Sequence, residues 1–210
     1  MMFSRRMFSW VTVGIALAAG QLPQAFAGEW VSLFDGRTMS GWTKAGKNGD
    51  KSKWEVVDGA IVGSGLSSML YSPKGEYKNF KFRAEIKISD GGNSGMYFRV
   101  PTASGNFSDG YEAQIDSTHR DPIRTGSLYG FCHIYRQLAP PDTWFTQEVE
   151  VVDKNWRGKV IPHIKISVNG EQLYEYLDYT KAWSKGYFGF QQHDPGSKVQ
   201  IRKIEVMELP

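Results

Sequence analysis

The sequence predicts an all-β fold, an antiparallel sandwich or barrel in a single domain, and three observations support this prediction. No segment keeps the 3.6-residue period of a helix for long. Short runs alternate apolar and polar residues instead, and Gly, Asn, Asp or Pro interrupts them about every 8–12 residues, a spacing typical of such folds. The 210 residues, 40% hydrophobic and 14% aromatic, suffice for one domain with a substantial core.

The alternating runs place the expected strands in chain order. They cover residues 30–34, 54–57, 60–63, 69–71, 80–89, 94–100, 110–116, 128–135, 145–152, 160–168, 171–175, 187–193 and 198–208. "KNWRGK" (154–159) is expected to form a loose hairpin loop, and residues 178–183 a short helical turn.

Two of the connections carry strong hairpin signals. Asp58-Gly59 in "VDGAIVG" and Asn169-Gly170 in "ISVNGEQLY" lie between apolar runs. These residues accept the positive φ angles of a type I′ turn, so each pair predicts a two-residue hairpin.

The first 27 residues have the pattern of a signal peptide. Arg5 and Arg6 precede the apolar run "VTVGIALAA", and "AFA" ends at Ala27. "SRRMF" also resembles the twin-arginine export motif, although "SW" follows it. The run is too short for a comfortable membrane span. We therefore expect a mature domain of residues 28–210, exported to the periplasm or secreted, and not an integral membrane protein.

The charge of the expected mature domain excludes several partners. Without the two arginines of the signal, 23 basic and 22 acidic residues remain. A nearly neutral domain has no basic footprint for nucleic acid and no polybasic patch for a membrane surface.

A single cysteine, Cys132, precludes an internal disulfide. His133 follows it directly and points to the opposite face if the segment is a strand. Cys132 is therefore interpreted as a small apolar residue rather than a nucleophile.

Three of the expected strands have one apolar and one polar face. The apolar sides carry Met96, Phe98, Val100, Tyr111, Ala113, Ile115, Phe188 and Phe190. The polar sides carry Asn93, Tyr97, Arg99, Glu112, Gln114, Asp116, Gln191 and His193. Solvated sheet faces usually carry Lys, Glu and Thr, so these faces favour the floor of a sugar-binding cleft. The strand-poor stretches 101–109 and 117–127 are expected at its rim.

Glu112 can pair with His193 or with a carboxylate from another strand, and the pairing with His193 is favoured. Glu112 and Asp116 are four strand residues apart, about 13 Å, whereas glycosidase carboxylate pairs lie about 5–9.5 Å apart. Glu112 with His193 can act as acid and base, or bind a divalent cation. The alternative for His193 is a hydrogen-bonded structural histidine, and His119, His133 and His163 lack comparable neighbours in the sequence.

The tryptophans divide into core and rim candidates. Trp42 and Trp54 lie in apolar strand contexts, which favour the core. Trp144, after "APPD", and Trp156, near a hairpin tip, are better candidates for stacking on a sugar, although packing is the commoner role.

Seven motifs in order make the chain similar to the 3-keto-disaccharide hydrolase family, from about residue 30 to 208. They are "LFDGRTMSGW", "WEVVDGAIVG", "NSGMYFR", "GYEAQIDS", "GSLYG", "VNGEQLYEY" and "GYFGFQQHDPGSKVQIRKIEV". The resemblance implies a concanavalin A-like jelly-roll β-sandwich of two antiparallel sheets. It also implies cleavage of glycosides whose C3 hydroxyl is oxidised to a ketone. A base then removes the acidified C2 proton, the C1 substituent leaves by β-elimination, and water adds back.

The resemblance also implies roles for the polar residues. Glu112 or His193 is the base or a ligand of a divalent metal ion, and no organic cofactor is expected. Arg99 and Asn93 hold hydroxyls or the developing oxyanion. The remaining substrate-binding candidates are Tyr97, Gln114, Asp116, Tyr129, Gln191 and Trp144. The family usually has "WN" where this chain has Trp144-Phe145, and often "QDHG" where it has Gln191-Gln192-His193-Asp194.

Two other functions stay open at this point. One is a non-catalytic carbohydrate-binding module, and the other is a conventional sandwich-fold glycosidase acting on unoxidised sugar. The resemblance favours the keto-glycoside reaction and implies that a sugar C3-oxidoreductase acts before it.

Overall fold

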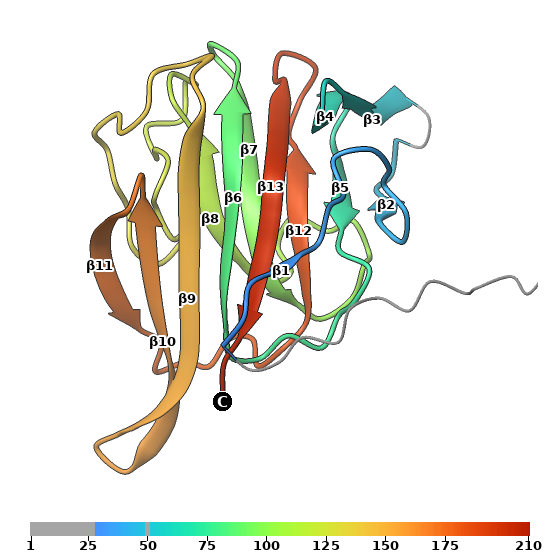
Figure 1. Ribbon diagram of the computed structural model, residues 1–210. Helices are drawn as coiled ribbons and strands as arrows, with labels where there is room; N and C mark the ends of the chain where they lie inside the picture. The colour runs from blue at the N-terminus through green and yellow to red at the C-terminus, as the bar shows by residue number, and fades with distance from the viewer. Residues whose placement is uncertain (1–27, 49–50) are drawn as a thin grey trace, which may run out of the picture.

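A computed structural model describes residues 28–48 and 51–210 as two antiparallel sheets packed face to face in a single domain (Figure 1). The expected all-β sandwich is thereby confirmed. The eight-stranded sheet has the order β11-β10-β9-β6-β13-β4-β3, with β1 paired to β13. The five-stranded sheet has the order β2-β5-β12-β7-β8. The predicted signal peptide, residues 1–27, lies outside the described residues.

The strands follow the expected runs closely. They are β1 (Val31–Ser32), β2 (Thr43–Ala45), β3 (Ser52–Val57), β4 (Ala60–Gly65), β5 (Ser68–Tyr71), β6 (Phe80–Ile88), β7 (Asn93–Val100), β8 (Tyr111–Asp116), β9 (Phe145–Trp156), β10 (Lys159–Val168), β11 (Glu171–Leu177), β12 (Tyr187–Gln192) and β13 (Val199–Glu208). The sequence gives no signal for the short edge strand β2.

Both predicted type I′ turns are confirmed by positive φ angles at the two central residues. These angles are 50° and 76° at Asp58-Gly59 and 51° and 81° at Asn169-Gly170. A third turn corrects an expectation. Residues 154–159 are a tight hairpin rather than a loose loop, because Arg157 and Gly158 have φ angles of 49° and 82° and Trp156 pairs with Lys159.

Two other expected elements are wrong. Residues 128–135 form no strand, because the segment turns back on itself and Leu128 bridges to Cys132. The turn leaves no extended stretch that could pair with a neighbouring strand. Residues 178–183 form a turn without helix; there Asp178 accepts hydrogen bonds from the Thr180 and Ala182 amides. The thiol of Cys132 is free and its side chain packs against the core, as expected.

The core lies between the sheets and is built by strict alternation. In β6 every second residue is buried, from Phe80 to Ile88. Phe82 of β6 stacks on Phe188 of β12 with ring centroids 3.9 Å apart, which joins the two sheets. All but one of the side chains expected in the core pack there; they are Met96, Phe98, Tyr111, Ala113, Ile115, Phe188 and Phe190. Such burial of aromatic and aliphatic surface is the dominant stabilising contribution.

The exception, Val100, follows a bulge in β7. Val100 pairs with Tyr187 and Tyr97 pairs with Gly189, so Phe98 and Arg99 together lie opposite Phe188. Arg99 takes the left-handed conformation, with φ 52°. A bulge of two residues opposite one bends a strand and interrupts its alternation. Val100 consequently packs with Tyr97 in a separate cluster on the outer side of the five-stranded sheet.

The bulge turns Arg99 away from the face on which the sequence predicts it. Its guanidinium is fully buried and donates to Asp153 Oδ1 of β9 at 2.9 Å, across the sandwich. It also donates to the carbonyl oxygens of Lys78, at 2.6 and 2.9 Å, and Trp183, at 3.2 Å. Arg99 is thus a structural link between the sheets.

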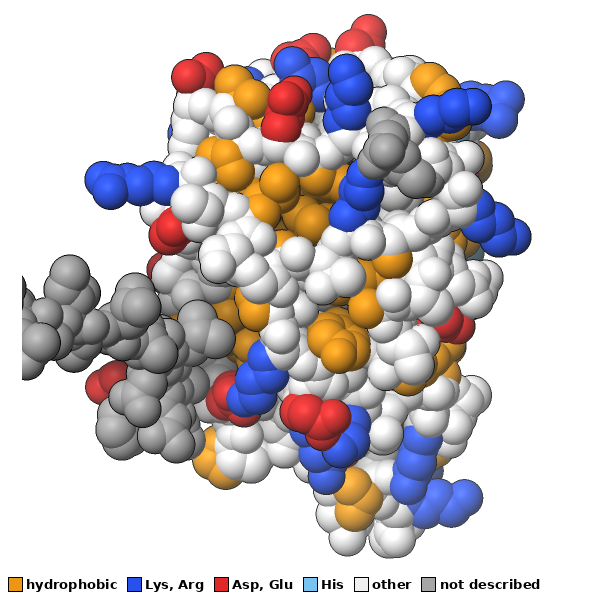
Figure 2. Space-filling view, turned by 90° about the vertical axis from the view of Figure 1, so that its right-hand side faces the viewer, with side chains coloured by type: hydrophobic (Ala, Val, Ile, Leu, Met, Phe, Trp, Pro, Cys, Tyr) orange, Lys and Arg blue, Asp and Glu red, His pale blue; other side chains and the backbone are white. Residues whose placement is uncertain are grey.

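Two surface properties complete the description. Among the described residues, no helix is long and apolar enough to cross a membrane. Figure 2 shows the side of the molecule at β2, β3 and β5, where basic and acidic side chains surround apolar areas near the centre of the face.

Asp153→Ala tests the structural role of Arg99. The variant leaves a buried guanidinium without its carboxylate, so we expect the free energy of unfolding in urea to fall by about 3 kcal/mol. Glu208→Ala is the control, because it breaks the exposed 2.8 Å pair with Lys74, for which the expected loss is below about 1 kcal/mol. Equal losses in the two variants would contradict the assigned role.

Candidate functional site

A pocket of about 330 Å³ lies on the outer face of the five-stranded sheet, over β7, β8 and β12. Its lining consists of Asn93, Tyr97, Phe107, Ser108, Gly110, Glu112, Gln114, Asp121, Tyr129, Phe131, Trp183, Gln191 and His193. The strands supply the floor, because alternate positions of β7 and β8 point outward. The loops after β7 and β8 supply the walls.

Seven of the ten site residues predicted from the sequence meet in this pocket. They are Asn93, Tyr97, Glu112, Gln114, Tyr129, Gln191 and His193. The two predicted rim stretches also contribute, with Phe107 and Ser108 from 101–109 and Asp121 from 117–127. Their meeting shows that the polar faces of the three strands form one surface.

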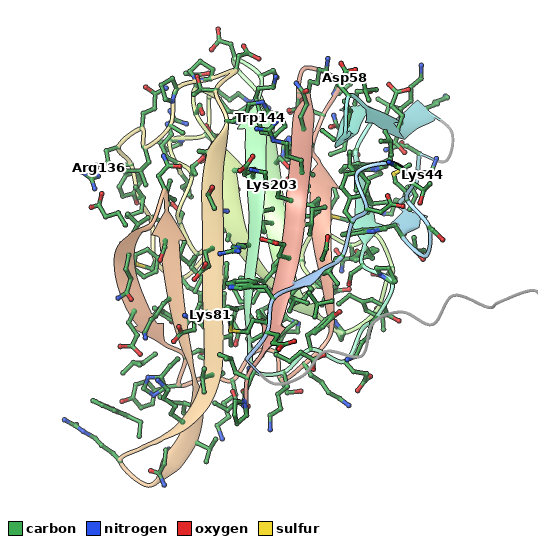
Figure 3. All side chains as sticks on the ribbon, in the orientation of Figure 1. Lys44, Asp58, Lys81, Arg136, Trp144 and Lys203 are labelled. Atoms are coloured by element: carbon green, nitrogen blue, oxygen red, sulfur yellow. The ribbon has the colours of Figure 1, made fainter. Side chains whose placement is uncertain are left out.

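Three predicted residues lie elsewhere. Arg99 faces the opposite sheet because of the bulge. Trp144 lies on the outer face of the eight-stranded sheet, where Lys87 and Arg202 stack over its ring (Figure 3). Trp144 precedes β9, which carries it to that side. Asp116 is buried beneath the pocket and accepts hydrogen bonds from the His119 amide and the Arg124 side chain. It holds the loop after β8 rather than lining the pocket.

Glu112 occupies a position that only a glycine neighbour permits. In the adjacent strand, a Cβ on Gly95 would lie 2.2 Å from Glu112 Oε1 and 2.6 Å from the Tyr97 ring. The missing side chain therefore creates the space for the carboxyl group. With its amide oriented to donate, Gln114 lies 3.1 Å from the same Oε1.

The surroundings of Glu112 favour its protonated form. Burial raises its pKa from 4.5 to about 8; repulsion from Asp121 adds to this shift, and the nearby Tyr97 side chain opposes it. A carboxylic acid that keeps its proton at neutral pH can donate it to a bound ligand, as catalytic acids do.

Tyr97 and Gln191 form a second polar unit in the pocket. Gln191 Nε2 donates to the Tyr97 hydroxyl at 3.0 Å, and this hydroxyl donates to the Phe107 carbonyl at 3.1 Å. Gln191 is 3% exposed, and its Oε1 has no hydrogen-bond partner within the described part of the chain. A buried acceptor without a partner is costly, so this oxygen is suited to a ligand hydroxyl.

Three residues near His193 were missed by the sequence analysis. The loop after β8 brings His119 to His193, with ring centroids 5.6 Å apart, and places Asp121 in the pocket wall. Asp194 accepts a hydrogen bond from His193 at 2.7 Å. His119 and His193 are 74 residues apart in the sequence, and no spacing rule signals their contact.

The side chains also define where a cation could bind. Within the described ranges, the group whose ligand atoms all lie within 4.8 Å of one another is His119, His193 and Asp194. Imidazole nitrogens and a carboxylate suit zinc and related divalent ions. Of the predicted ligand pair, His193 belongs to this group, whereas Glu112 lines the pocket outside it.

A second hollow of about 740 Å³ adjoins the pocket across Phe107. It is lined by Gly46, Lys47, Asn48, Ser67, Ser104, Gly105, Asn106 and Phe107. Phe107 lines both hollows, so a ligand with two linked rings has room for one ring in each hollow.

The chain matches a known domain family and a curated relative over most of its length. Residues 29–207 match the model of the 3-keto-alpha-glucoside-1,2-lyase-like domain. The chain is 28% identical to a 3-keto-disaccharide hydrolase of Bacteroides thetaiotaomicron, over 90% of this chain and 81% of that protein.

Two solved structures share the fold. One is a protein of Parabacteroides distasonis, provisionally named a glycosyl hydrolase, with a TM-score of 0.64, 20% identity, and coverage of 86% of this chain and 100% of that one. The other is the carbohydrate-binding module CBM66 of Bacillus subtilis, with a TM-score of 0.61, 16% identity, and coverage of 82% and 98%.

The raised pKa of Glu112 predicts a specific pH dependence of stability. The unfolded chain releases the Glu112 proton near pH 4.5 and the folded chain near pH 8. The contribution of Glu112 to the free energy of unfolding is therefore largest below pH 4.5, and we expect it to decline as the pH rises from 4.5 to 8. Glu112→Gln should flatten the decline, and a ¹³C NMR titration of the Glu112 carboxyl should give a midpoint near 8. A midpoint near 4.5 would contradict the assigned environment.

Gly95→Ala tests the space beside Glu112. The added methyl group displaces the Glu112 carboxyl or the Tyr97 ring, which changes how far the carboxyl is shielded from water. We therefore expect the midpoint of the Glu112 titration to shift by about one pH unit. Gly189→Ala is the matched control in the next strand, since its Cβ approaches Tyr71 and Met69 side chains no closer than 3.1 Å. A titration unchanged in Gly95→Ala would show that the glycine is dispensable.

Proposed function

This chain belongs to the family of 3-keto-alpha-glucoside-1,2-lyase-like domains, and we propose that it cleaves glycosides whose C3 hydroxyl is oxidised to a ketone. The observation that carries the proposal is the meeting, in one pocket, of the Glu112 carboxyl, whose pKa is raised by burial, with the His193 imidazole. Cleavage of a keto-glycoside needs one group that accepts a proton and one that donates a proton, and Glu112 and His193 can fill these two roles.

The chemistry follows from the ketone. It acidifies the C2 proton, which a base removes to give an enolate. The C1–O bond then breaks, and water adds to the resulting double bond, so that elimination and hydration together equal hydrolysis. Glu112 and His193 are the candidates for proton transfer, and this mechanism requires no pair of ionised carboxylates around an acetal.

The other pocket residues recognise the sugar. Asn93, Gln191 and Tyr129 present amide and hydroxyl groups to ring hydroxyls, and the unpaired Oε1 of Gln191 accepts one of them. The developing oxyanion at C3 takes a hydrogen bond from the Asn93 amide, because Arg99 is outside the pocket and the Gln114 amide is directed at Ser94 and Glu112. The hollow beyond Phe107 accommodates the aglycone or second sugar.

A divalent cation held near His193 is proposed as the alternative to a free histidine base. Such a cation would polarise oxygens of the substrate. Export to the periplasm or the medium, with cleavage near Ala27, is likewise proposed from the N-terminal sequence. The substrate must come from a sugar C3-oxidoreductase, since the proposed reaction consumes a ketone that unmodified glycosides lack.

Two other functions have specific support. Asp121 shares the pocket with Glu112 and raises its pKa by repulsion, so a conventional glycosidase with these two carboxyl groups is a second candidate. A carbohydrate-binding module of similar fold makes a non-catalytic role the third.

Substrate choice separates these functions. We expect turnover of p-nitrophenyl 3-keto-glucoside and none of p-nitrophenyl glucoside, because only the ketone acidifies C2. Glu112→Gln and His193→Gln should each lower kcat/KM by roughly 10²–10⁴-fold, the usual effect of losing an acid or base. Glu55→Gln, an exposed carboxyl of β3, is the control.

Three results would contradict the proposal. Hydrolysis of only the unoxidised glucoside would support the conventional glycosidase. Binding of both sugars without turnover would support the binding module. Full activity in both variants would remove Glu112 and His193 from the mechanism. The same assay after treatment with a chelator tests the cation.

A further inference from the structure

The hydrogen bonds of Asp194 determine the proton position on His193. Asp194 Oδ1 accepts from the Gly196 amide at 2.8 Å, and Oδ2 lies 2.7 Å from His193 Nδ1. The amide N–H at one oxygen and the imidazole nitrogen at the other favour the ionised carboxylate, which can only accept. Because a carboxylate only accepts, His193 Nδ1 must carry the hydrogen, which leaves Nε2 of the neutral ring as the acceptor.

The free nitrogen of His193 faces ligand space. His193 lines the pocket, and within residues 28–48 and 51–210 no side chain or backbone group forms a hydrogen bond with its Nε2. The Phe107 ring stacks against the imidazole at 6.3 Å and 26°. This packing restricts ring rotation and keeps one orientation.

His119 supports Asp194 from the opposite side. The Asp121 amide donates to His119 Nδ1 at 3.1 Å, so the neutral ring carries its hydrogen on Nε2. That nitrogen lies 3.8 Å from Asp194 Oδ2. The distance exceeds a hydrogen bond, but an N–H directed at a carboxylate still attracts it. The His119 amide is itself held by Asp116 Oδ1 at 3.1 Å.

This pattern of hydrogens is unfavourable for a cation among the three residues. A metal ion held between Asp194 and the two rings would need the lone pairs of His193 Nδ1 and His119 Nε2, the nitrogens that here carry hydrogens toward Asp194. At His119, coordination through Nε2 would move the hydrogen to Nδ1, where it would oppose the Asp121 amide hydrogen. The arrangement is instead that of a carboxylate orienting a histidine base.

We propose that His193 is the base of the pocket, accepting through Nε2, and that Asp194 and His119 are positioning residues that fix this tautomer. The role as base rests on the proposed function. In that reaction the C2–H bond breaks and its proton moves to Nε2, while the electron pair enters the enolate. The C1–O bond breaks next, the aglycone oxygen takes the proton of the Glu112 carboxyl, and the imidazolium returns its proton through water to the Glu112 carboxylate.

The tautomer can be measured without any substrate. In the full chain labelled with ¹⁵N-histidine, long-range ¹H–¹⁵N NMR distinguishes a protonated Nδ1 from a protonated Nε2, and His193→Gln assigns the signal. We expect Nδ1–H in the wild type. Asp194→Asn places an amide donor beside Nδ1 when its oxygen keeps the Gly196 bond, so Nε2–H should then dominate. A wild type with Nε2–H overturns the proposal whatever the activity.

Kinetics test the consequence for catalysis. Asp194→Asn should lower kcat on p-nitrophenyl 3-keto-glucoside about 10²–10³-fold with KM changed less than about threefold, because the base rather than binding is affected. His119→Gln should cost about tenfold, and Asp194→Glu should recover part of the loss. The control is Asp58→Asn, at the β3–β4 turn (Figure 3). Circular dichroism melting confirms that each variant folds.

The remaining outcomes each decide a separate claim. A normal kcat in Asp194→Asn together with the altered tautomer overturns the role of His193 as base. Binding of one Zn²⁺ or Mn²⁺ per chain that His119→Gln abolishes, with activity dependent on it, overturns the hydrogen-bonded arrangement in favour of a metal site. A wild type inactive on all 3-keto-glycosides overturns the proposed function and with it the base, while the NMR measurement still decides the positioning by Asp194.

Discussion

The site depends on the bulge at Arg99. One extra residue in β7 sends a guanidinium through the sandwich to Asp153 and leaves Tyr97 and Val100 on the outer face. A non-glycine residue with φ 52° is strained by roughly 1–3 kcal/mol, and the four buried hydrogen bonds of the guanidinium offset this cost. One of these bonds, to the Trp183 carbonyl, holds a residue that lines the pocket. Fold and site are therefore coupled through Arg99, a residue that does not line the pocket itself.

Local rules account for the parts that the sequence predicts well. Strands and I′ turns depend on residues close in the chain. At Asp58-Gly59 and Asn169-Gly170, the sequence shows both the turn residues and the apolar runs of the strands on either side. Asn93, Tyr97, Glu112 and Gln114 were found for the same reason, since they occupy alternate positions of two regular strands. The predictions of Trp144 in the pocket and of a strand at residues 128–135 were wrong, because alternation does not show which sheet a residue joins or which strand a segment pairs with.

Long-range pairing accounts for what the sequence misses. The bulge at Arg99 exists only relative to β12, which begins at Tyr187, so no pattern within β7 reveals it. His119 reaches His193 because Asp116 and Arg124 fold the intervening loop back over the sheet. Gly95 offers a partial signal: a glycine inside a strand often marks close approach, and here it admits the Glu112 carboxyl.

The difference between a binding surface and a catalytic one lies in how two proton-carrying groups are held. A surface that only binds sugar needs amides, hydroxyls and rings, such as Asn93, Gln191 and Phe107, and gains nothing from a carboxyl group kept neutral by burial. Here desolvation favours the proton on Glu112, while an ionised Asp194 favours an open Nε2 on His193. Opposite environments for two titratable groups in one pocket assign one as donor and the other as acceptor. This asymmetry is the physical ground for proposing an enzyme rather than a binding module.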